Sequence, residues 1–227
     1  MKNLKYYEKE ARNHNAFTVH VQNFKQYRTF RPHWHDYYEL LFFYDGSAKV
    51  YCNDIECAVC AGDLVVVNRS EVHTMFSEAG ANYYCVLLHP EFFSDIAFDN
   101  IQFPNLIKAD KAAEILMRKL YSETCAKQPG SDMLLKSYAY TLMTHLLRSY
   151  TTTRISEKES KILAQKAQRM DKVLNYIDTH YTEKLSTHAL ATFCYLNESY
   201  FCRAFKKATG KSVLDYITDY RIEKAAL

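Results

Sequence analysis

Residues 185–210 read LSTHALATFCYLNESYFCRAFKKATG, and this stretch decides the organisation of the chain. It predicts two short helices joined by a tight turn at residues 195–197. Ser186 is a good N-cap for the first helix and Asn197 for the second, because a short polar side chain accepts hydrogen bonds from the free amides of a first turn. Gly210 ends the second helix, since glycine enters the left-handed conformation without steric cost.

Two stripes of side chains follow the second predicted helix. Apolar residues with helical spacing predict a buried face, formed by Phe201, Ala204, Phe205 and Ala208. Polar residues with the same spacing predict an outward face, formed by Ser199, Cys202, Arg203 and Lys206. Such a helix suits a DNA major groove, although the solvated face of any small helical domain has the same pattern.

A wider set of side chains has one register over residues 190–225: Leu190-Ala191, Leu196-Asn197, Tyr200-Phe201, Arg203, Phe205-Lys206-Lys207, Thr209-Gly210 and the run RIEKA at 221–225. This set resembles the first helix-turn-helix of the AraC family of bacterial transcription regulators. The resemblance implies a recognition helix at residues 197–208. It implies DNA contacts from Asn197, Glu198, Ser199, Cys202, Arg203 and Lys206.

Individual positions in the predicted recognition helix suggest different contacts with DNA. Arg203 can bind guanine in a bidentate manner, whereas Cys202 is a weak donor that suits shape or a thymine methyl group. Tyr195 occupies the turn position where the family usually has glycine. We therefore expect Tyr195 to adopt a positive φ, at a cost of about 1 kcal/mol.

Length and composition limit the classes of protein to which the chain can belong. The chain has 227 residues, 48% of them hydrophobic and 24% charged, which is typical of a soluble protein with two domains. The N-terminus is charged, and no apolar run approaches the roughly 18 residues of a membrane span, so we expect a cytoplasmic protein without a membrane partner. The odd count of seven cysteines favours reduced thiols, and the single pair Cys57–Cys60 is a weak metal or redox motif.

The N-terminal half has β character. A polar arm at residues 1–16 is followed by aromatic and β-branched runs from Phe17 to about Cys85, interrupted by turn residues. Several short strands at this spacing predict a sandwich or barrel. The predicted fold class is therefore α+β, with a sandwich or barrel and a helical hairpin, followed by an all-α helix-turn-helix domain.

A histidine-rich segment at residues 33–46, HWHDYYELLFFYDG, lies within the β-rich half. Strand alternation predicts one face with His33, His35, Tyr37 and Glu39, and the opposite face with Trp34, Asp36 and Tyr38. The spacing resembles the first motif of cupins, and His73 falls at the histidine of their second motif. This resemblance implies that the β-rich unit is a cupin-like double-sheet jelly roll. That second motif is degraded, because Asn68 and Ser70 replace its usual proline and glycine.

Three interpretations of this segment stay open. The favoured one is an organic effector pocket, with a sugar or other small metabolite bound by His33, His35, Tyr37, Glu39 and His73. Aromatic residues would form its rim, namely Trp34, Tyr37, Tyr38 and the phenylalanines, although Phe42 and Phe43 suit the core better. A structural cluster is the second interpretation. The third is a divalent metal at His33, His35, Glu39 and His73, which is not favoured, so no cofactor is expected.

The remaining chain divides into helices. Residues 1–108 form the predicted sensing domain with its arm, and residues 109–150 form a hairpin of two amphipathic helices capped by Asp110. In the resembled family such a hairpin makes a homodimer. Residues 151–168 are polar and predict a linker that becomes helical near its end. Residues 169–227 form the DNA-binding unit, whose last helix is capped by Ser212 and carries Val213, Ile217 and Tyr220 on its apolar side.

These features favour a ligand-responsive transcription regulator that binds double-stranded DNA and is not an enzyme. A metal-dependent cupin enzyme, an isomerase or dioxygenase, is the alternative that would use the histidines. A sensor-only dimer that titrates full-length partners is a further alternative. Family members usually carry a second helix-turn-helix, which this sequence lacks, so we expect weak DNA binding unless the chain dimerises.

Overall fold

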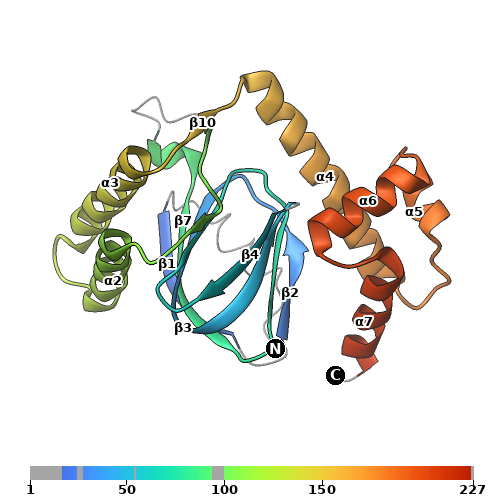
Figure 1. The fold of residues 1–227 in the computed structure, drawn as a ribbon, viewed down its shortest axis with the longest axis horizontal. Coiled ribbons are helices and arrows are strands. Elements are labelled where there is room, and N and C mark those ends of the chain that lie inside the picture. Colours follow the sequence, from blue (N-terminus) through green and yellow to red (C-terminus); the bar gives the residue numbers. More distant parts are fainter. Residues whose placement is uncertain (1–16, 25–27, 54, 94–99, 226–227) are drawn as a thin grey trace.

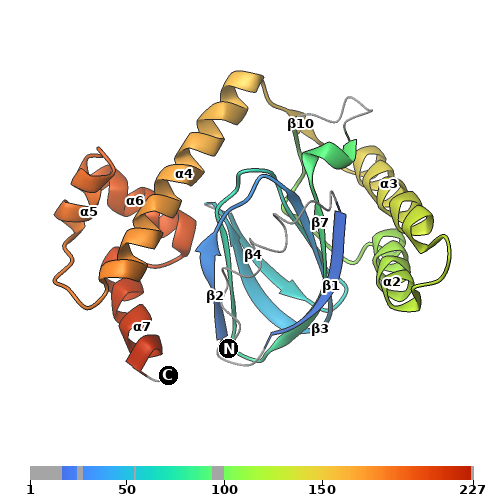
Figure 2. The same ribbon diagram turned by 180° about the vertical axis from the view of Figure 1, so that it is seen from behind.

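A β-rich body separates two helical layers in the computed structural model (Figures 1 and 2). The structure describes residues 17–24, 28–53, 55–93 and 100–225, so the predicted N-terminal arm lies outside the described residues. Helices α2 and α3 cover one side of the body, and α4 to α7 lie on the opposite side. The predicted α+β class, a β-rich unit followed by a helical unit, is confirmed.

Two antiparallel layers form the β-rich body and share the long strand β3 (Tyr38–Cys52). The first half of β3 pairs with β7 and β5, and its second half pairs with β6 and β4. The first layer has the order β1-β7-β3-β5-β9, with β1 (Phe17–Phe24), β7 (Ala81–Leu88), β5 (Leu64–Val67) and β9 (Leu106–Ile107). The second layer contains β2 (Arg28–His33), β6 (His73–Ser77) and β4 (Ile55–Cys60).

Side chains of β3 alternate between two cores. Tyr38, Leu40 and Phe42 face the helical hairpin, where they join a buried cluster with residues of α2 and α3. Leu41 and Phe43 face the space between the two β layers and join a second cluster. Because successive side chains point to opposite faces of a strand, Glu39 is directed into that interior space. The prediction that Phe42 and Phe43 belong to the core is confirmed.

The hairpin consists of α2 (Lys111–Ala126) and α3 (Ser131–Ser149), preceded by the short 3-10 helix η1 (Pro90–Phe93). Asp110 caps α2 as predicted, since its carboxylate accepts from the amides of Ala112 and Ala113. The same carboxylate lies 2.7 Å from Nε2 of His145 and accepts a hydrogen bond from the Tyr150 hydroxyl. One acidic side chain therefore ties the start of α2 to the end of α3.

The segment predicted as a linker, residues 151–168, is largely regular structure. Its start contains β10 (Thr153–Arg154), which pairs with β8 (Ile101–Gln102), and α4 (Glu157–His180) begins soon afterwards. Ser156 and Glu159 form a capping box at the start of α4. The predicted boundary at residue 169 therefore falls inside one helix of 24 residues, which leads from the β8–β10 pair to the DNA-binding unit.

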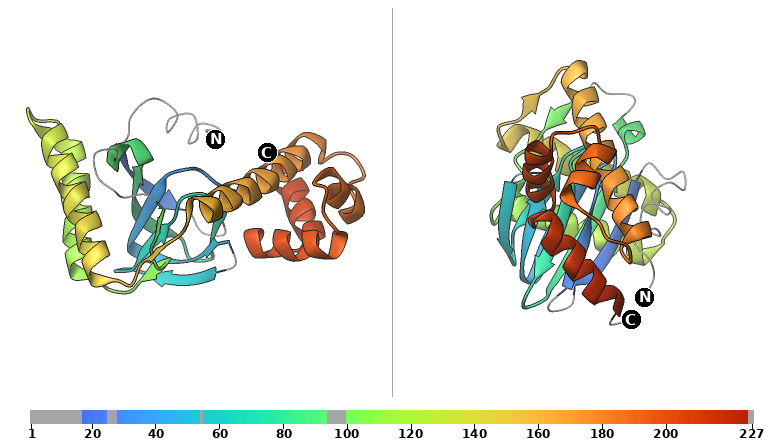
Figure 3. Two further views of the ribbon diagram at one scale, coloured as in Figure 1. Left: turned by 90° about the horizontal axis from the view of Figure 1, so that it is seen from above. Right: turned by 90° about the vertical axis from the view of Figure 1, so that its right-hand side faces the viewer.

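Three further helices complete that unit, α5 (Thr187–Phe193), α6 (Glu198–Thr209) and α7 (Val213–Ala225) (Figure 3). Ser186 and Asn197 cap α5 and α6 as predicted, and Gly210 ends α6 with a φ of 72°. Tyr195 has the expected positive φ, 58°, and its side chain is 95% exposed. Among the described residues, every helix is too short or too polar to cross a membrane.

Candidate functional site

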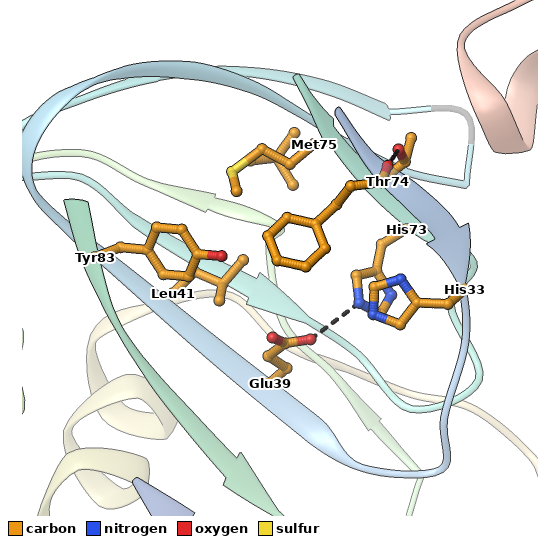
Figure 4. Close-up of a pocket in the computed structure, with 9 residues that line it drawn as sticks. His33, Glu39, Leu41, His73, Thr74, Met75 and Tyr83 are labelled. Atoms are coloured by element: carbon orange, nitrogen blue, oxygen red, sulfur yellow. Dashed lines mark hydrogen bonds and ion pairs between the residues drawn. The ribbon is translucent and has the colours of Figure 1, made fainter. Parts of the chain in front are cut away.

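Four predicted site residues converge in the space between the β layers. His33 ends β2, Glu39 lies near the start of β3, His73 begins β6, and His35 lies in the connection between β2 and β3. One nitrogen or oxygen atom from each of the four lies within 4.8 Å of the other three. Figure 4 shows the rings of His33 and His73 beside each other, with the Glu39 carboxylate opposite.

One carboxylate oxygen is the meeting point of this histidine–glutamate cluster (His33, His35, Glu39 and His73). Oε2 of Glu39 lies 3.0 Å from Nε2 of His35 and 2.9 Å from Nε2 of His73, although the His73 contact lacks hydrogen-bond geometry. The other oxygen, Oε1, accepts a hydrogen bond from the buried Cys85 thiol at 3.1 Å. The carboxylate therefore has a fixed orientation, with Oε2 directed toward the histidines.

Main-chain carbonyls fix the tautomers of two of the rings. Nδ1 of His33 lies 2.9 Å from the Arg31 carbonyl, and Nδ1 of His73 lies 3.1 Å from the Glu71 carbonyl. A carbonyl oxygen only accepts, so both Nδ1 atoms carry hydrogen. In the neutral rings, Nε2 is then the atom with a free lone pair. Backbone carbonyls that accept a hydrogen bond from one ring nitrogen orient metal-binding histidines in the same way.

Burial and mutual contact set the charges of the cluster. Burial lowers the pKa of His33 most, and neighbouring His73 lowers it further, to about 3. Burial alone would raise the pKa of Glu39, but contacts with His35 and His73 outweigh burial and hold the pKa well below its usual value. Burial alone would lower the pKa of His73, but contact with the Glu39 carboxylate raises it. The cluster therefore combines a neutral His33 with an ionised Glu39.

A cavity of about 30 Å³ opens beside the cluster. Its wall is mostly apolar and comes from β2, β3, β6 and β7: Phe30, His33, Glu39, Leu41, Val50, His73, Thr74, Met75 and Tyr83. A single water needs roughly 10–15 Å³ of such space, so this cavity accommodates an ion or a few small atoms. A sugar requires more room than the structure provides here.

The predicted aromatic rim is wrong in part. Residues 33–39 are not one continuous strand, because β2 ends at His33 and β3 begins at Tyr38. Tyr38 is 1% exposed and lies in the core under the hairpin, and Trp34 packs against the DNA-binding unit. Tyr37 meets His35 edge to face, with ring centroids 5.4 Å apart, but does not line the cavity.

Sequence reasoning missed several residues that shape the cluster. Cys85 holds Glu39, and Arg31 orients His33, yet neither matches a recognisable motif. Cys85 becomes visible only through strand pairing, because its partner in β3 is Leu41, two residues from Glu39. Strand register between distant segments is the information that a single sequence lacks.

The predicted DNA-binding face lies on α6. Ser199, Arg203 and Lys206 are exposed, whereas Phe201 and Phe205 are buried in the core of the unit, as their spacing predicted. The rest of the predicted set is less available. Cys202 is half-buried against the core, the Asn197 side chain caps α6, and the Glu198 carboxylate accepts a hydrogen bond from Thr187.

Comparisons with known proteins match both units of the chain. The AraC-like ligand binding domain matches residues 14–143, and the bacterial regulatory helix-turn-helix proteins of the AraC family match residues 177–218. The HTH-type transcriptional regulator YdeC of Bacillus subtilis, itself uncharacterised, is 24% identical over 207 residues, which are 86% of this chain and 71% of YdeC. The Msm operon regulatory protein of Streptococcus mutans is 21% identical over 211 residues, 87% of this chain and 72% of that protein.

One solved structure has a similar fold over most of the chain. Wild-type ToxT of Vibrio cholerae with a bound unsaturated fatty acid superposes with a TM-score of 0.50 at 14% identity, covering 90% of this chain and 96% of ToxT. At this identity the likeness extends to the fold alone. It covers both the β-rich unit and the helical unit.

Proposed function

The chain belongs to the AraC family of bacterial regulatory helix-turn-helix proteins, and from that membership we propose a ligand-responsive DNA-binding transcription regulator. One observation carries this proposal: a single chain combines an inward cluster of ligand-binding groups with an outward polar face on the second helix of a helix-turn-helix. The β-rich unit would bind the effector, and α6 would enter the DNA groove. We assign the chain no enzymatic activity.

The DNA-binding proposal assigns base reading to Arg203, with Ser199 and Lys206 as its neighbours on the exposed face. A bidentate contact between arginine and guanine discriminates by about 1–3 kcal/mol, which is roughly 5- to 150-fold in affinity. Arg203 is exposed, so its removal leaves the free energy of unfolding within about 0.5 kcal/mol.

Selection from a random DNA pool at low salt tests this assignment. Arg203→Ala should lose about 5- to 150-fold in affinity for the selected sequence and relax the preference at one base position. Arg148→Ala is the matched control, because Arg148 is also exposed but lies on α3, across the β-rich body from α6. Unchanged affinity and unchanged base preference in Arg203→Ala would refute the base-reading assignment.

The effector proposal rests on the histidine–glutamate cluster. An organic effector would have to widen the cavity, whereas a divalent transition-metal ion fits the existing space and donor set. Imidazole nitrogen and carboxylate oxygen are ligands that such ions prefer, and metal–ligand distances near about 2 Å place neighbouring donors within roughly 3–4 Å of each other. His33, His35, Glu39 and His73 would hold the ion, which would supply a positive centre joining β2, β3 and β6.

Calorimetric titration with Zn²⁺, Mn²⁺ and small sugars tests the effector class. We expect one divalent ion per chain and no heat with the sugars. His73→Ala should abolish that binding, while His89→Ala, a control outside the cluster, should preserve it. Sugar binding without ion binding would favour the organic effector and refute the metal.

Dimerisation through the hairpin is also proposed. Ile115 on α2 and Met133 and Leu134 on α3 are large apolar residues that are 44–77% exposed. A second copy that covers this face would remove apolar surface from water. Sedimentation of the double variant Met133→Glu/Leu134→Glu should give a monomer. Ile162→Glu, on the exposed side of α4, is the matched control, and a variant hairpin that still dimerises would contradict the proposal.

A further inference from the structure

Arg31 joins the β-rich unit to the DNA-binding unit. Its guanidinium donates to the Asp178 carboxylate at 3.2 Å and to the Tyr220 hydroxyl at 3.1 Å. It also lies 3.7 Å from the Glu223 carboxylate and 4.2 Å above the Tyr220 ring. One side chain from β2 therefore contacts both α4 and α7. These partners are 147 or more residues away in sequence.

Two further residues of the β-rich unit belong to the same interface. Val72 is 4% exposed and lies within the buried apolar cluster of the DNA-binding unit, and Trp34 packs against that cluster. At the end of α6, Gly210 comes close to the ring of Tyr51: a side-chain Cβ on Gly210 would lie 3.2 Å from it. The DNA-binding unit therefore packs on a defined surface of the β-rich unit, the seat, which is formed by Arg31, Trp34, Tyr51 and Val72.

Interface residues alternate in sequence with residues of the histidine–glutamate cluster. Arg31 and Trp34 flank His33, and Val72 directly precedes His73. Arg31 links the cluster to the DNA-binding unit directly. Its carbonyl accepts the hydrogen bond from Nδ1 of His33, and its guanidinium donates hydrogen bonds to α4 and α7. A change in the position of His33 therefore reaches the interface through one residue.

We propose that Arg31, Trp34 and Val72 form a relay that couples occupancy of the histidine–glutamate cluster to the seating of the DNA-binding unit. This inference rests on the proposed effector site. A ligand bound at Nε2 of His33 fixes the ring whose Nδ1 holds the Arg31 carbonyl, and a ligand bound at His73 fixes the strand end next to Val72. Occupancy thus favours the seated arrangement, because the ligand binds best where these strand ends are held.

Trp34 provides the measurement, since it is the sole tryptophan of the chain and lies at the interface. Its emission wavelength reports on the burial of the indole ring. Hydrogen exchange of the α7 amides reports on the same interface from the DNA-binding unit. Arg31→Met should shift the emission to the red and speed α7 exchange by about tenfold, the factor expected for one charged hydrogen-bonded group. Arg118→Met, which removes an arginine paired with Glu114 on α2, should change neither signal.

Zn²⁺ is the probe for the coupling itself, with binding followed separately by calorimetry. In the wild type, Zn²⁺ should shift the Trp34 emission to the blue and slow α7 exchange. In Arg31→Met, Zn²⁺ should still bind while the α7 response is lost. Binding to the wild type without either change would overturn the relay and leave the effector site intact.

A second variant tests the relay without any ligand. His33→Ala retains the Arg31 side chain but removes the hydrogen bond to its carbonyl, so α7 exchange should rise and the emission should shift to the red. Unchanged exchange and emission in His33→Ala would overturn the relay. If Zn²⁺ does not bind the wild type, the proposed metal effector fails, and His33→Ala alone decides the relay.

Discussion

The Asp110 carboxylate should hold the start of α2 against the end of α3 with a pH-dependent strength. Its side chain is 9% exposed and meets the α2 amides, His145 and Tyr150. Burial alone would raise the pKa of Asp110, but hydrogen bonds from Ala113 and Tyr150 and the contact with His145 outweigh burial and lower the pKa from 3.8 to about 2. Burial, together with the hydrogen bond to the Asp110 carboxylate, raises the pKa of Tyr150 to about 12.

The size of the effect follows from this pKa. Each pKa unit corresponds to about 1.4 kcal/mol, so the fall from 3.8 to about 2 is worth about 2 kcal/mol of folding free energy. A carboxyl group whose pKa is lowered on folding stabilises the protein above its unfolded pKa. Its contribution is complete above about pH 5 and is lost as the pH falls from about 4 toward 2.

Asp110→Asn isolates the charge, because asparagine caps a helix nearly as well as aspartate. Urea unfolding followed by circular dichroism should show a loss of about 2 kcal/mol at pH 7. The difference between variant and wild type should shrink below pH 4. Asp132→Asn, at an exposed acidic residue in the first turn of α3, is the control and should stay within about 0.5 kcal/mol of the wild type. A difference that is constant from pH 7 to pH 3 would refute the reasoning.

Three further variants probe the DNA-binding unit and the cluster. Phe205→Ala removes a fully buried ring and should lower the free energy of unfolding by about 3–5 kcal/mol in urea, whereas the half-exposed control Tyr200→Ala should cost under about 1 kcal/mol. Gly210→Ala combines a positive φ with the close Tyr51 ring and should lower the melting temperature through a loss of about 1–2 kcal/mol, and an unchanged melting temperature would contradict the seat. Glu39→Gln keeps the size of the side chain but removes its charge, so calorimetry should show zinc affinity reduced by at least about tenfold, and wild-type affinity would exclude the carboxylate as a ligand.

Local signals in the sequence predicted the helical unit well. Ser186, Asn197 and Gly210 each act within one turn of their own position, so their roles follow from short-range backbone chemistry. The start of α4 had a comparable signal, because Ser156 and Glu159 have capping-box spacing. The polar composition of residues 151–168 nevertheless favoured a linker that becomes helical only near its end, whereas α4 begins at Glu157.

In the β-rich unit, local sequence signals are not sufficient to predict the structure. The cluster residues were predicted from an alternation that assumed one strand through residues 33–39, and they do converge, but for a different reason. β2 pairs with β6 so that His33 lies opposite His73, and the chain then crosses through residues 34–37 to begin β3. Trp34 was assigned to the pocket but packs on the DNA-binding unit. Local periodicity could not predict this contact, because the residues that Trp34 packs against come much later in the sequence.

The position of Glu39 places the cluster next to both helical layers at once. Its neighbours Tyr38 and Leu40 are buried beneath the hairpin, and its carboxylate contacts His73, whose ring packs against His33. Arg31 and Trp34, on either side of His33 in sequence, contact the DNA-binding unit. The two helical layers lie on opposite sides of the β-rich body, so a signal between them must cross it. The path from Glu39 through His73 to His33 is short, and close packing along it transmits small displacements rather than absorbing them. The proposed ligand site therefore lies on this path, between the core beneath the hairpin and the interface with the DNA-binding unit.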